Sequence, residues 1–206
     1  MRAETVASAL RHAISGGQYR PGQQLVEAEL TASYEVSRNT LREAFRMLEH
    51  DGIIVRHRNR GCFIAQPSVD DVADIYTARL IIEPGVLRHA TTIDVASLWG
   101  IVSQAQAAVA TNNLGEVAGL NQLFHRRLVA FAASPTLDQT MDSLLARLRL
   151  VFLAAVDHDP QFHVPYVDDN AQVCAYLEEG AREKAAGFLE ERLRATLRDV
   201  RGVLGQ

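Results

Sequence analysis

The spacing of apolar residues changes twice along the 206-residue chain and so restricts its fold. Helical spacing runs from Val6 to the glycine pair at 16–17, over about 26–34, and from an N-cap at Ser37 to residues 51–52. Between Ile53 and Ile64, two apolar triplets flank a polar stretch, which predicts a β-hairpin. After Pro67 only helical segments follow, at about 69–90, 94–111, 114–132, 136–157, 168–179 and 181–203.

These segments predict a mostly α fold with two domains. Residues 1–66 would form a winged helix-turn-helix, with three helices and a β-hairpin wing. Residues 67–206 would form an antiparallel all-helical bundle of about six helices, because the connections between the segments are short.

Composition and cysteine usage exclude several classes of protein. The chain is 48% hydrophobic and 22% charged, close to the globular average, which argues against disorder. It has no apolar run long enough for a membrane helix and no signal-peptide core, so we expect a cytoplasmic protein. Cys62 and Cys174 have no Cys or His neighbours at metal-binding spacing, so neither a zinc site nor a disulfide framework is predicted.

The charge is divided between the two predicted domains. The net charge of −4 by itself argues against a nucleic-acid partner. However, residues 1–66 hold nine Arg and seven acidic residues, whereas residues 67–206 hold twelve basic and eighteen acidic residues. Basic residues therefore outnumber acidic ones only in the predicted winged helix.

Within that domain, arginines recur on the predicted third helix and on the wing. Arg38, Arg42 and Arg46 are spaced at i, i+4 and i+8, so they form one ridge beside the apolar stripe. Arg58 and Arg60 crowd the hairpin tip. A solvated face paired with nearby glutamates is the alternative for the helix alone, but a basic helix beside a basic wing favours DNA binding.

Several short segments carry a family resemblance. The PG at 21–22, SRNTLREA at 37–44, LEHDG at 48–52 and RG at 60–61 are spaced as in the winged-helix domain of GntR-family bacterial transcription regulators, which residues 6–66 resemble. The resemblance implies DNA contacts from Ser37, Arg38, Thr40, Arg42, Asn59 and Arg60. Ala28 departs from it, since many relatives carry a DNA-contacting charge there. One recognition helix contacts few base pairs, so we expect a homodimer on palindromic operator DNA.

The predicted bundle places polar residues among its apolar positions. Arg79 and Glu83 lie one turn apart and could pair, and Asn121 and His125 are likewise four residues apart. The full set is Arg79, Glu83, Asn121, His125, Arg149, Asn170 and Arg192. Each could be a satisfied core or dimer-interface group, but together they predict a polar cavity whose three arginines favour a small carboxylate as effector.

Residues 69–203 resemble the helical FCD-type effector domain of the FadR subfamily, through IYTARLIIE and LFHRRLVAFAASPTL. In that domain a carboxylate and a histidine at i, i+4, with two later histidines, commonly hold a divalent metal near the effector. The resemblance places Asn121, His125, Asn170 and Arg192 at these positions. Carboxamides are poor ligands for transition metals and Arg is repelled by them, so we predict no metal cofactor and an anionic effector that meets Arg192 directly.

The sequence therefore predicts a ligand-responsive DNA-binding transcription regulator, a repressor of metabolic genes. One alternative is a DNA-binding protein whose effector cavity has degenerated. Another is a helical-bundle enzyme that uses Glu83, Asn121 and His125 for acid–base chemistry, which we disfavour because no nucleophile with a base and an orienting group can be found.

Overall fold

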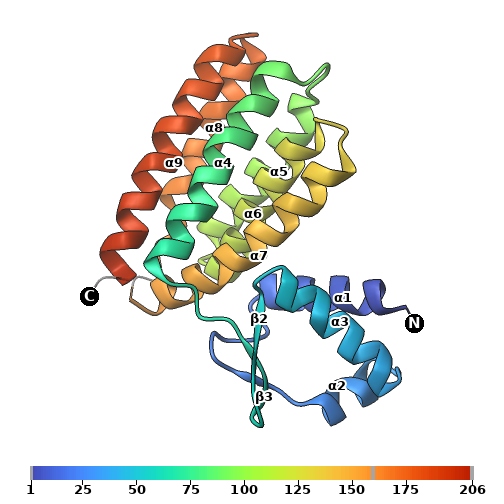
Figure 1. The fold of residues 1–206 in the computed structure, drawn as a ribbon. Coiled ribbons are helices and arrows are strands. Elements are labelled where there is room, and N and C mark those ends of the chain that lie inside the picture. Colours follow the sequence, from blue (N-terminus) through green and yellow to red (C-terminus); the bar gives the residue numbers. More distant parts are fainter. Residues whose placement is uncertain (1, 159–160, 205–206) are drawn as a thin grey trace. The chain divides into compact units, whose positions relative to one another are not determined.

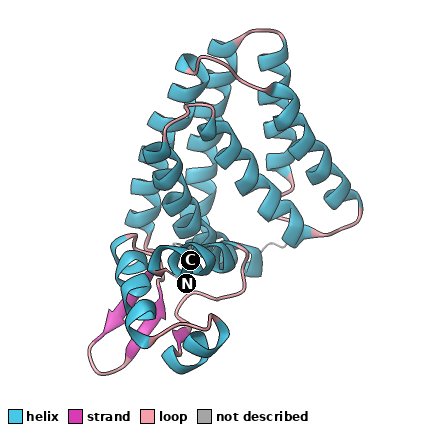
Figure 2. Cartoon of the chain, turned by 90° about the vertical axis from the view of Figure 1, so that its right-hand side faces the viewer, coloured by secondary structure: helices cyan, strands magenta, loops and turns pink. Residues whose placement is uncertain are grey.

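The computed structural model describes residues 2–158 and 161–204, and most of them are helical (Figure 1). By their contacts the residues form two compact units. The first contains Met1–Pro67 with Ser143–Ala154, and the second contains Ser68–Asp142 with Ala155–Gln206. All strands of the described residues lie in the first unit (Figure 2).

The first unit has the predicted three helices and hairpin. The helices are α1 (Ala3–Ser15), α2 (Glu27–Ser33) and α3 (Arg38–His50). The hairpin consists of β2 (Ile54–His57) and β3 (Gly61–Ile64), with Val55 opposite Phe63. A two-residue strand, β1 (Gln24–Leu25), adds to the other edge of β3, giving the antiparallel order β1-β3-β2. The prediction missed β1, because two residues are too few to show a period.

One apolar core holds the first unit together. Leu10 and Ile14 of α1 pack with Leu41 and Phe45 of α3 and with the inner face of the sheet. Ala146 and Leu150, from the part of α7 that belongs to this unit, join the same core. Each buried side chain of this kind contributes about 1.5–3 kcal/mol, so the exposed faces of α3 and the wing are held on a rigid base.

The second unit is the predicted helical bundle. Its helices are α4 (Val69–His89), α5 (Val95–Ala110), α6 (Leu114–Ala130), α7 (Pro135–His158, shared with the first unit), α8 (Pro165–Glu178) and α9 (Arg182–Leu204). α4 packs along α9 and α5 along α6, while α8 contacts α5, α6 and α9. α8 begins three residues before its predicted start, with Pro165 in the first turn, where a missing N–H costs nothing.

Side chains at the helix starts explain where the bundle helices begin. Ser68 accepts a hydrogen bond from the Asp71 amide, and the Asp71 carboxylate accepts one from the Ser68 amide, which forms a capping box at α4. The side chains of Asp94 and Asn113 cap α5 and α6 by accepting hydrogen bonds from the amides of Ser97 and Glu116. In the described part of the chain, no helix is long and apolar enough to cross a membrane. Cys62 and Cys174 are both buried and free.

Candidate functional site

The first candidate surface begins at the N-terminus of α3. The Ser37 hydroxyl accepts a hydrogen bond of 3.1 Å from the backbone amide of Thr40 and lies 2.9 Å from the Thr40 hydroxyl. Ser37 is therefore the N-cap that the sequence predicts, and it orients Thr40 as well. Both side chains lie at the start of the predicted recognition helix, Ser37 exposed and Thr40 half-buried.

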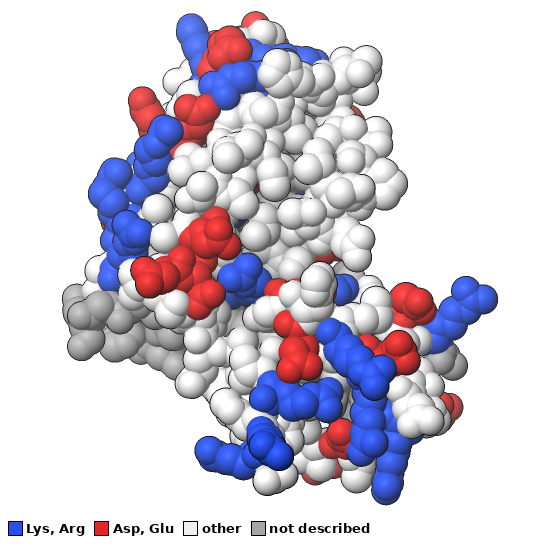
Figure 3. Space-filling view, viewed as in Figure 1, with Lys and Arg blue, Asp and Glu red and all other residues white. Residues whose placement is uncertain are grey.

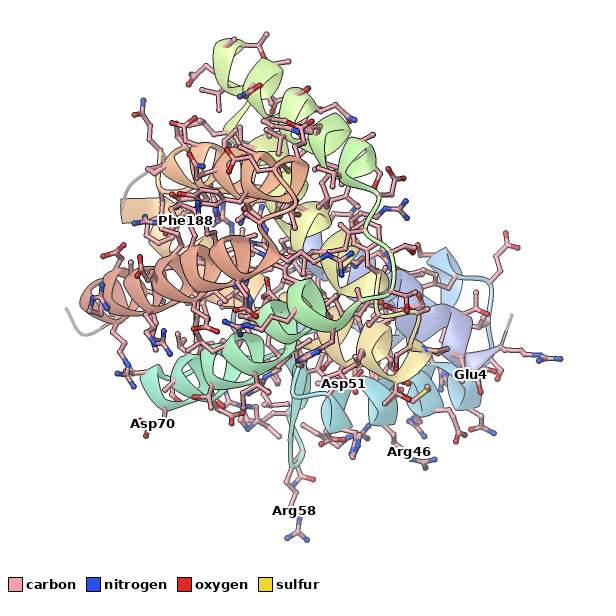
Figure 4. The ribbon with its side chains drawn as sticks, turned by 90° about the horizontal axis from the view of Figure 1, so that it is seen from above. Glu4, Arg46, Asp51, Arg58, Asp70 and Phe188 are labelled. Carbon is pink, nitrogen blue, oxygen red and sulfur yellow. The ribbon has the colours of Figure 1, made fainter. Side chains whose placement is uncertain are left out.

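The three arginines of α3 form the predicted exposed ridge. Arg38, Arg42 and Arg46 are all exposed, whereas Leu41 and Phe45 between them are buried. The Arg42 side chain is held, because its Nε donates to the Glu27 carboxylate of α2 at 3.2 Å. Arg46 points out from α3 (Figure 4) and lies 3.8 Å from Glu43. Two of the three ridge arginines thus lie beside glutamates, Arg42 at Glu27 and Arg46 more loosely at Glu43, whereas Glu49 pairs with Arg56 of β2.

The wing presents two more arginines. Arg58 extends outward from the hairpin tip (Figure 4). Asn59 has a φ of 62°, a left-handed turn conformation that Asn tolerates well, so it shapes the tip. Gln24 of β1 donates to the backbone carbonyl of Arg60 at 2.9 Å, and the Arg60 guanidinium lies over the Phe63 ring. The missed strand β1 therefore supports the wing.

These residues make one basic surface. Figure 3 shows arginines gathered on the first unit over α3 and the wing, with some acidic side chains among them. Seven of the eight residues predicted to contact DNA are exposed on it, and Thr40 is half-buried. The chemistry suits phosphates and guanine edges, which an Arg fork can bond bidentately.

The second candidate site is a polar cluster buried in the bundle. Arg79 and Glu83 of α4 pair as the sequence predicts, with Arg79 Nε 2.5 Å from Glu83 Oε1. His125 of α6 lies on the other carboxylate oxygen, its Nδ1 2.6 Å from Glu83 Oε2. All three side chains are buried. Glu83 is thus bridged by two nitrogen groups from two helices.

Charge and burial compete in this cluster. Burial raises the pKa of Glu83, but Arg79 and His125 outweigh it and hold the pKa well below its usual range, so Glu83 is ionised. Burial also lowers the pKa of His125, more than the Glu83 charge raises it, so the imidazole is neutral near pH 7. A neutral His125 that donates Nδ1–H to Glu83 keeps Nε2 as an acceptor.

Asn121 and Asn170 are brought together beside this cluster. Asn170 Nδ2 of α8 donates to Asn121 Oδ1 of α6 at 2.9 Å, and both residues are buried. Arg192 does not point into the bundle, as the sequence predicts it to do. Its side chain is 37% exposed, and its Nε donates to Asp169 at 2.8 Å. Arg192 lies at the edge of the apolar stripe of α9, where a long side chain can reach solvent.

Arg149 is also placed differently from its prediction. Its part of α7 belongs to the first unit, and its guanidinium lies against Gly17. It is buried as predicted, but it does not join Arg79, Glu83 and His125. The three-arginine cavity predicted from the sequence therefore reduces to Arg79 alone within the buried cluster.

Two tyrosines of the cluster escaped prediction. Tyr76 of α4 is fully buried, and the Arg79 guanidinium lies over its ring, 5.2 Å from the centroid. Tyr166 of α8 is also buried and hydrogen-bonds with Thr196. In the sequence Tyr76 falls on the apolar stripe of its helix, and its position three residues before Arg79 was the available signal. The Tyr76 hydroxyl and Arg79 Nη2 are buried and have no hydrogen-bond partner among the described residues.

A winged helix with exposed arginines, joined to a helical bundle with a polar interior, defines a DNA-binding transcription regulator. Residues 2–64 match the family of bacterial regulatory proteins, gntR family, and residues 74–195 match the FCD domain. The chain therefore belongs to the GntR-type regulators that carry an FCD domain. Since this family and the named relatives are regulators, the protein is a transcription regulator and not an enzyme.

The names of individual similar proteins agree with this family assignment. A GntR transcriptional regulator from Rhodococcus sp. RHA1 is 31% identical over 97% of both chains, with a TM-score of 0.87. McbR/YncC of E. coli shares the fold, with a TM-score of 0.79 at 19% identity over 96% of both chains. The Nta operon transcriptional regulator of Aminobacter aminovorans is 31% identical over 64% of each chain. The gluconate operon transcriptional repressor of Bacillus subtilis is 29% identical over 60% of this chain and 52% of its own length. The chain thus spans less than two thirds of these two curated relatives.

Proposed function

We propose that this protein is a cytoplasmic repressor of metabolic genes that binds a palindromic operator as a homodimer and senses a small carboxylate in its helical bundle. The DNA-binding residues would be Ser37, Arg38, Thr40, Arg42, Arg46, Arg58, Asn59 and Arg60. Of the predicted effector residues, Arg79, Glu83 and His125 form the centre of the site and Asn121 and Asn170 its border.

The single observation that carries the effector proposal is the pair of unsatisfied donors at Tyr76 and Arg79. An unpaired buried donor costs about 1–3 kcal/mol, so a ligand with oxygens that accept from these donors would be favoured. Burial raises the pKa of Tyr76, so its hydroxyl stays protonated and able to donate. Glu83 holds Arg79 by Nε, which fixes the guanidinium and leaves Nη2 for the ligand.

A carboxylate is the ligand oxygen that best suits these donors. A hydrogen bond from a guanidinium to a carboxylate is about twice as strong as one between neutral groups. The name of the Bacillus subtilis relative, a gluconate operon repressor, also refers to a carboxylate. Arg149 and Arg192 would then not contact the ligand.

A thermal-shift screen of small carboxylates, gluconate included, tests the effector proposal. We expect one of them to raise the melting temperature and to weaken the operator complex in a gel-shift assay. Tyr76→Phe keeps the ring and removes the donor, so it should lower effector affinity by about 10- to 100-fold, as a lost bond to a charged group costs about 1.5–3 kcal/mol. Tyr176→Phe, on α8 against Phe188, is the matched control. If Tyr76→Phe binds the effector like the wild type, the donor pair is not the site.

The dimer proposal rests on an apolar surface of the bundle. Ile81 of α4 is 72% exposed. A groove beside it is lined by residues of α4, of the α6–α7 connection and of the start of α7, including Ile82, Val86, Phe131 and Leu137. In Figure 3 a wide part of the bundle surface beside α4 carries no charged side chains, whereas acidic side chains gather at the first turns of α4. A second copy of this chain is the natural occupant, because an operator reader of one short helix needs two copies.

Sedimentation of an Ile81→Arg variant tests the dimer. We expect the wild type to sediment as a dimer and Ile81→Arg as a monomer that binds the operator weakly. Gln172→Arg, which adds the same charge on an exposed position of α8, should stay dimeric. A dimeric Ile81→Arg protein would place the interface elsewhere.

A further inference from the structure

In this chain, the four positions that correspond to the metal ligands of related FCD domains are all engaged by other residues of the chain. Asn121 and Asn170 bond each other, His125 bonds Glu83, and Arg192 pairs with Asp169. The Asn121–Asn170 bond joins α6 to α8, and the Glu83–His125 bond joins α4 to α6. These hydrogen bonds link the helices at the four positions.

The donor set does not fit a divalent transition metal. Of the four side chains, only His125 is an ordinary ligand, and with Nδ1 on Glu83 it offers a metal one nitrogen, Nε2. One such ligand is too few for a transition-metal site. Glu83 cannot replace a missing carboxylate, because its two oxygens bond Arg79 and His125. Within residues 2–158 and 161–204, no three His, Cys, Asp or Glu side chains form a group that could hold a metal ion. The guanidinium of Arg79 would also repel a cation.

The Asn121–Asn170 hydrogen bond can do the structural work of a metal. A metal in such a site connects ligands from different helices and thereby stabilises their packing. The amide pair makes the same α6–α8 connection across 49 residues of sequence, with both side chains buried. Because both groups are neutral, they need no counter-charge in the bundle interior.

We propose that the Asn121–Asn170 hydrogen bond takes the place of a bound metal as the link between α6 and α8, so that the sensor bundle folds and binds its effector without a metal ion. The statement about the effector rests on the proposed function; the statement about the link does not. The positive charge that attracts the effector is then that of Arg79, whose Nη2 is unpaired.

The first test measures metal in the wild-type protein. Protein purified from zinc- and nickel-supplemented cultures and then dialysed is analysed for metal, and its melting temperature is recorded with Zn²⁺, Ni²⁺, Mn²⁺ or EDTA. We expect far less than one metal ion per chain and an unchanged melting temperature. About one ion per chain, with a melting temperature that falls in EDTA, would overturn the proposal. These readouts need no effector, so they separate this proposal from the proposed function.

The second test rebuilds the metal-ligand set. The triple variant Asn121→Asp, Asn170→His, Arg192→His should melt below the wild type in EDTA and above its own EDTA value in Zn²⁺. If it folds only with Zn²⁺, refolding yield with and without the ion gives the same answer. If Zn²⁺ changes neither the melting temperature nor the refolding yield of the triple variant, the Asn121–Asn170 link does not lie at the metal position.

A double-mutant cycle tests the link itself. Asn121→Ala and Asn170→Ala should each lower the melting temperature, and the double variant should lose clearly less than the sum of the two losses, because both remove one bond. Gln172→Ala, on an exposed position of the same helix α8, is the control and should melt like the wild type. Fully additive losses would show that the two amides do not form the link.

Discussion

Arg42 offers the clearest test of the DNA surface at the scale of single residues. It is exposed, and Glu27 holds its Nε, so its other guanidinium nitrogens are presented in a fixed direction. We predict that Arg42→Ala weakens operator binding by about 1–3 kcal/mol per half-site without changing the melting temperature. Arg198→Ala, an exposed arginine of α9, serves as the control in the same gel-shift titration. Equal affinities of the two variants would show that α3 does not contact the operator.

His125 gives a residue-scale prediction for pH. Burial lowers its pKa in the folded state, so the folded protein binds fewer protons than the unfolded chain as the pH falls below about 6.5. Stability is therefore lost on acidification from that pH towards the lower folded pKa. We predict a smaller loss of melting temperature between pH 7.5 and 5.5 for His125→Gln, which can still donate to Glu83. Parallel pH profiles of the two proteins would contradict this assignment.

Glu83 adds a second loss at lower pH. The pKa of its carboxyl is held below the usual value, so the stabilisation is complete above about pH 4.3 and disappears as the pH falls through the folded pKa. The His125→Gln variant should keep this second, more acidic transition, because the Arg79 pair remains. The two steps can therefore be told apart in one titration.

At the scale of elements, Ser37 combines two roles that a pair of substitutions can separate. Its hydroxyl caps α3, and the family resemblance also places it on the DNA. We predict that Ser37→Ala destabilises the protein by about 0.5–2 kcal/mol, the usual cost of losing an N-cap. Ser37→Asp should retain the cap and the stability but repel the DNA backbone. Urea unfolding and gel-shift titration of both variants measure the two effects, and an Asp variant that binds normally would remove Ser37 from the DNA surface.

The elements also show what a single sequence can predict. Helix positions followed from the 3.6-residue period and from caps such as Ser37, because both signals are local. β1 could not be found, since its two residues pair with β3 some forty positions away. Arg192 was predicted to point inward because it lies close to the apolar stripe, yet a few ångströms of side-chain length let it reach Asp169 and solvent. The Glu83–His125 contact could not be predicted from the sequence, because the packing of the whole bundle sets the register of α4 against α6.

At the scale of the whole molecule, the uneven charge predicts how binding depends on salt. The net charge of −4 would repel DNA at long range, but the arginines of α3 and the wing lie on one surface. If each protomer of a dimer neutralises about three to five phosphates, the slope of log affinity against log salt is about −5 to −9. Gel-shift or fluorescence titrations from low to high salt measure this slope, and a value near zero would mean that the basic surface does not face DNA.

The same slope reports how many copies bind. Arg58 extends from the wing tip, so we expect Arg58→Ala to remove one phosphate contact per protomer and two per dimer. We predict that this variant reduces the slope by about 1.8 for a dimer but by only about 0.9 for a monomer. A monomeric Ile81→Arg protein should show roughly half the wild-type slope, near −2.5 to −4.5. A full wild-type slope from a monomer would mean that one protomer supplies all the phosphate contacts, and the operator would then need no second half-site.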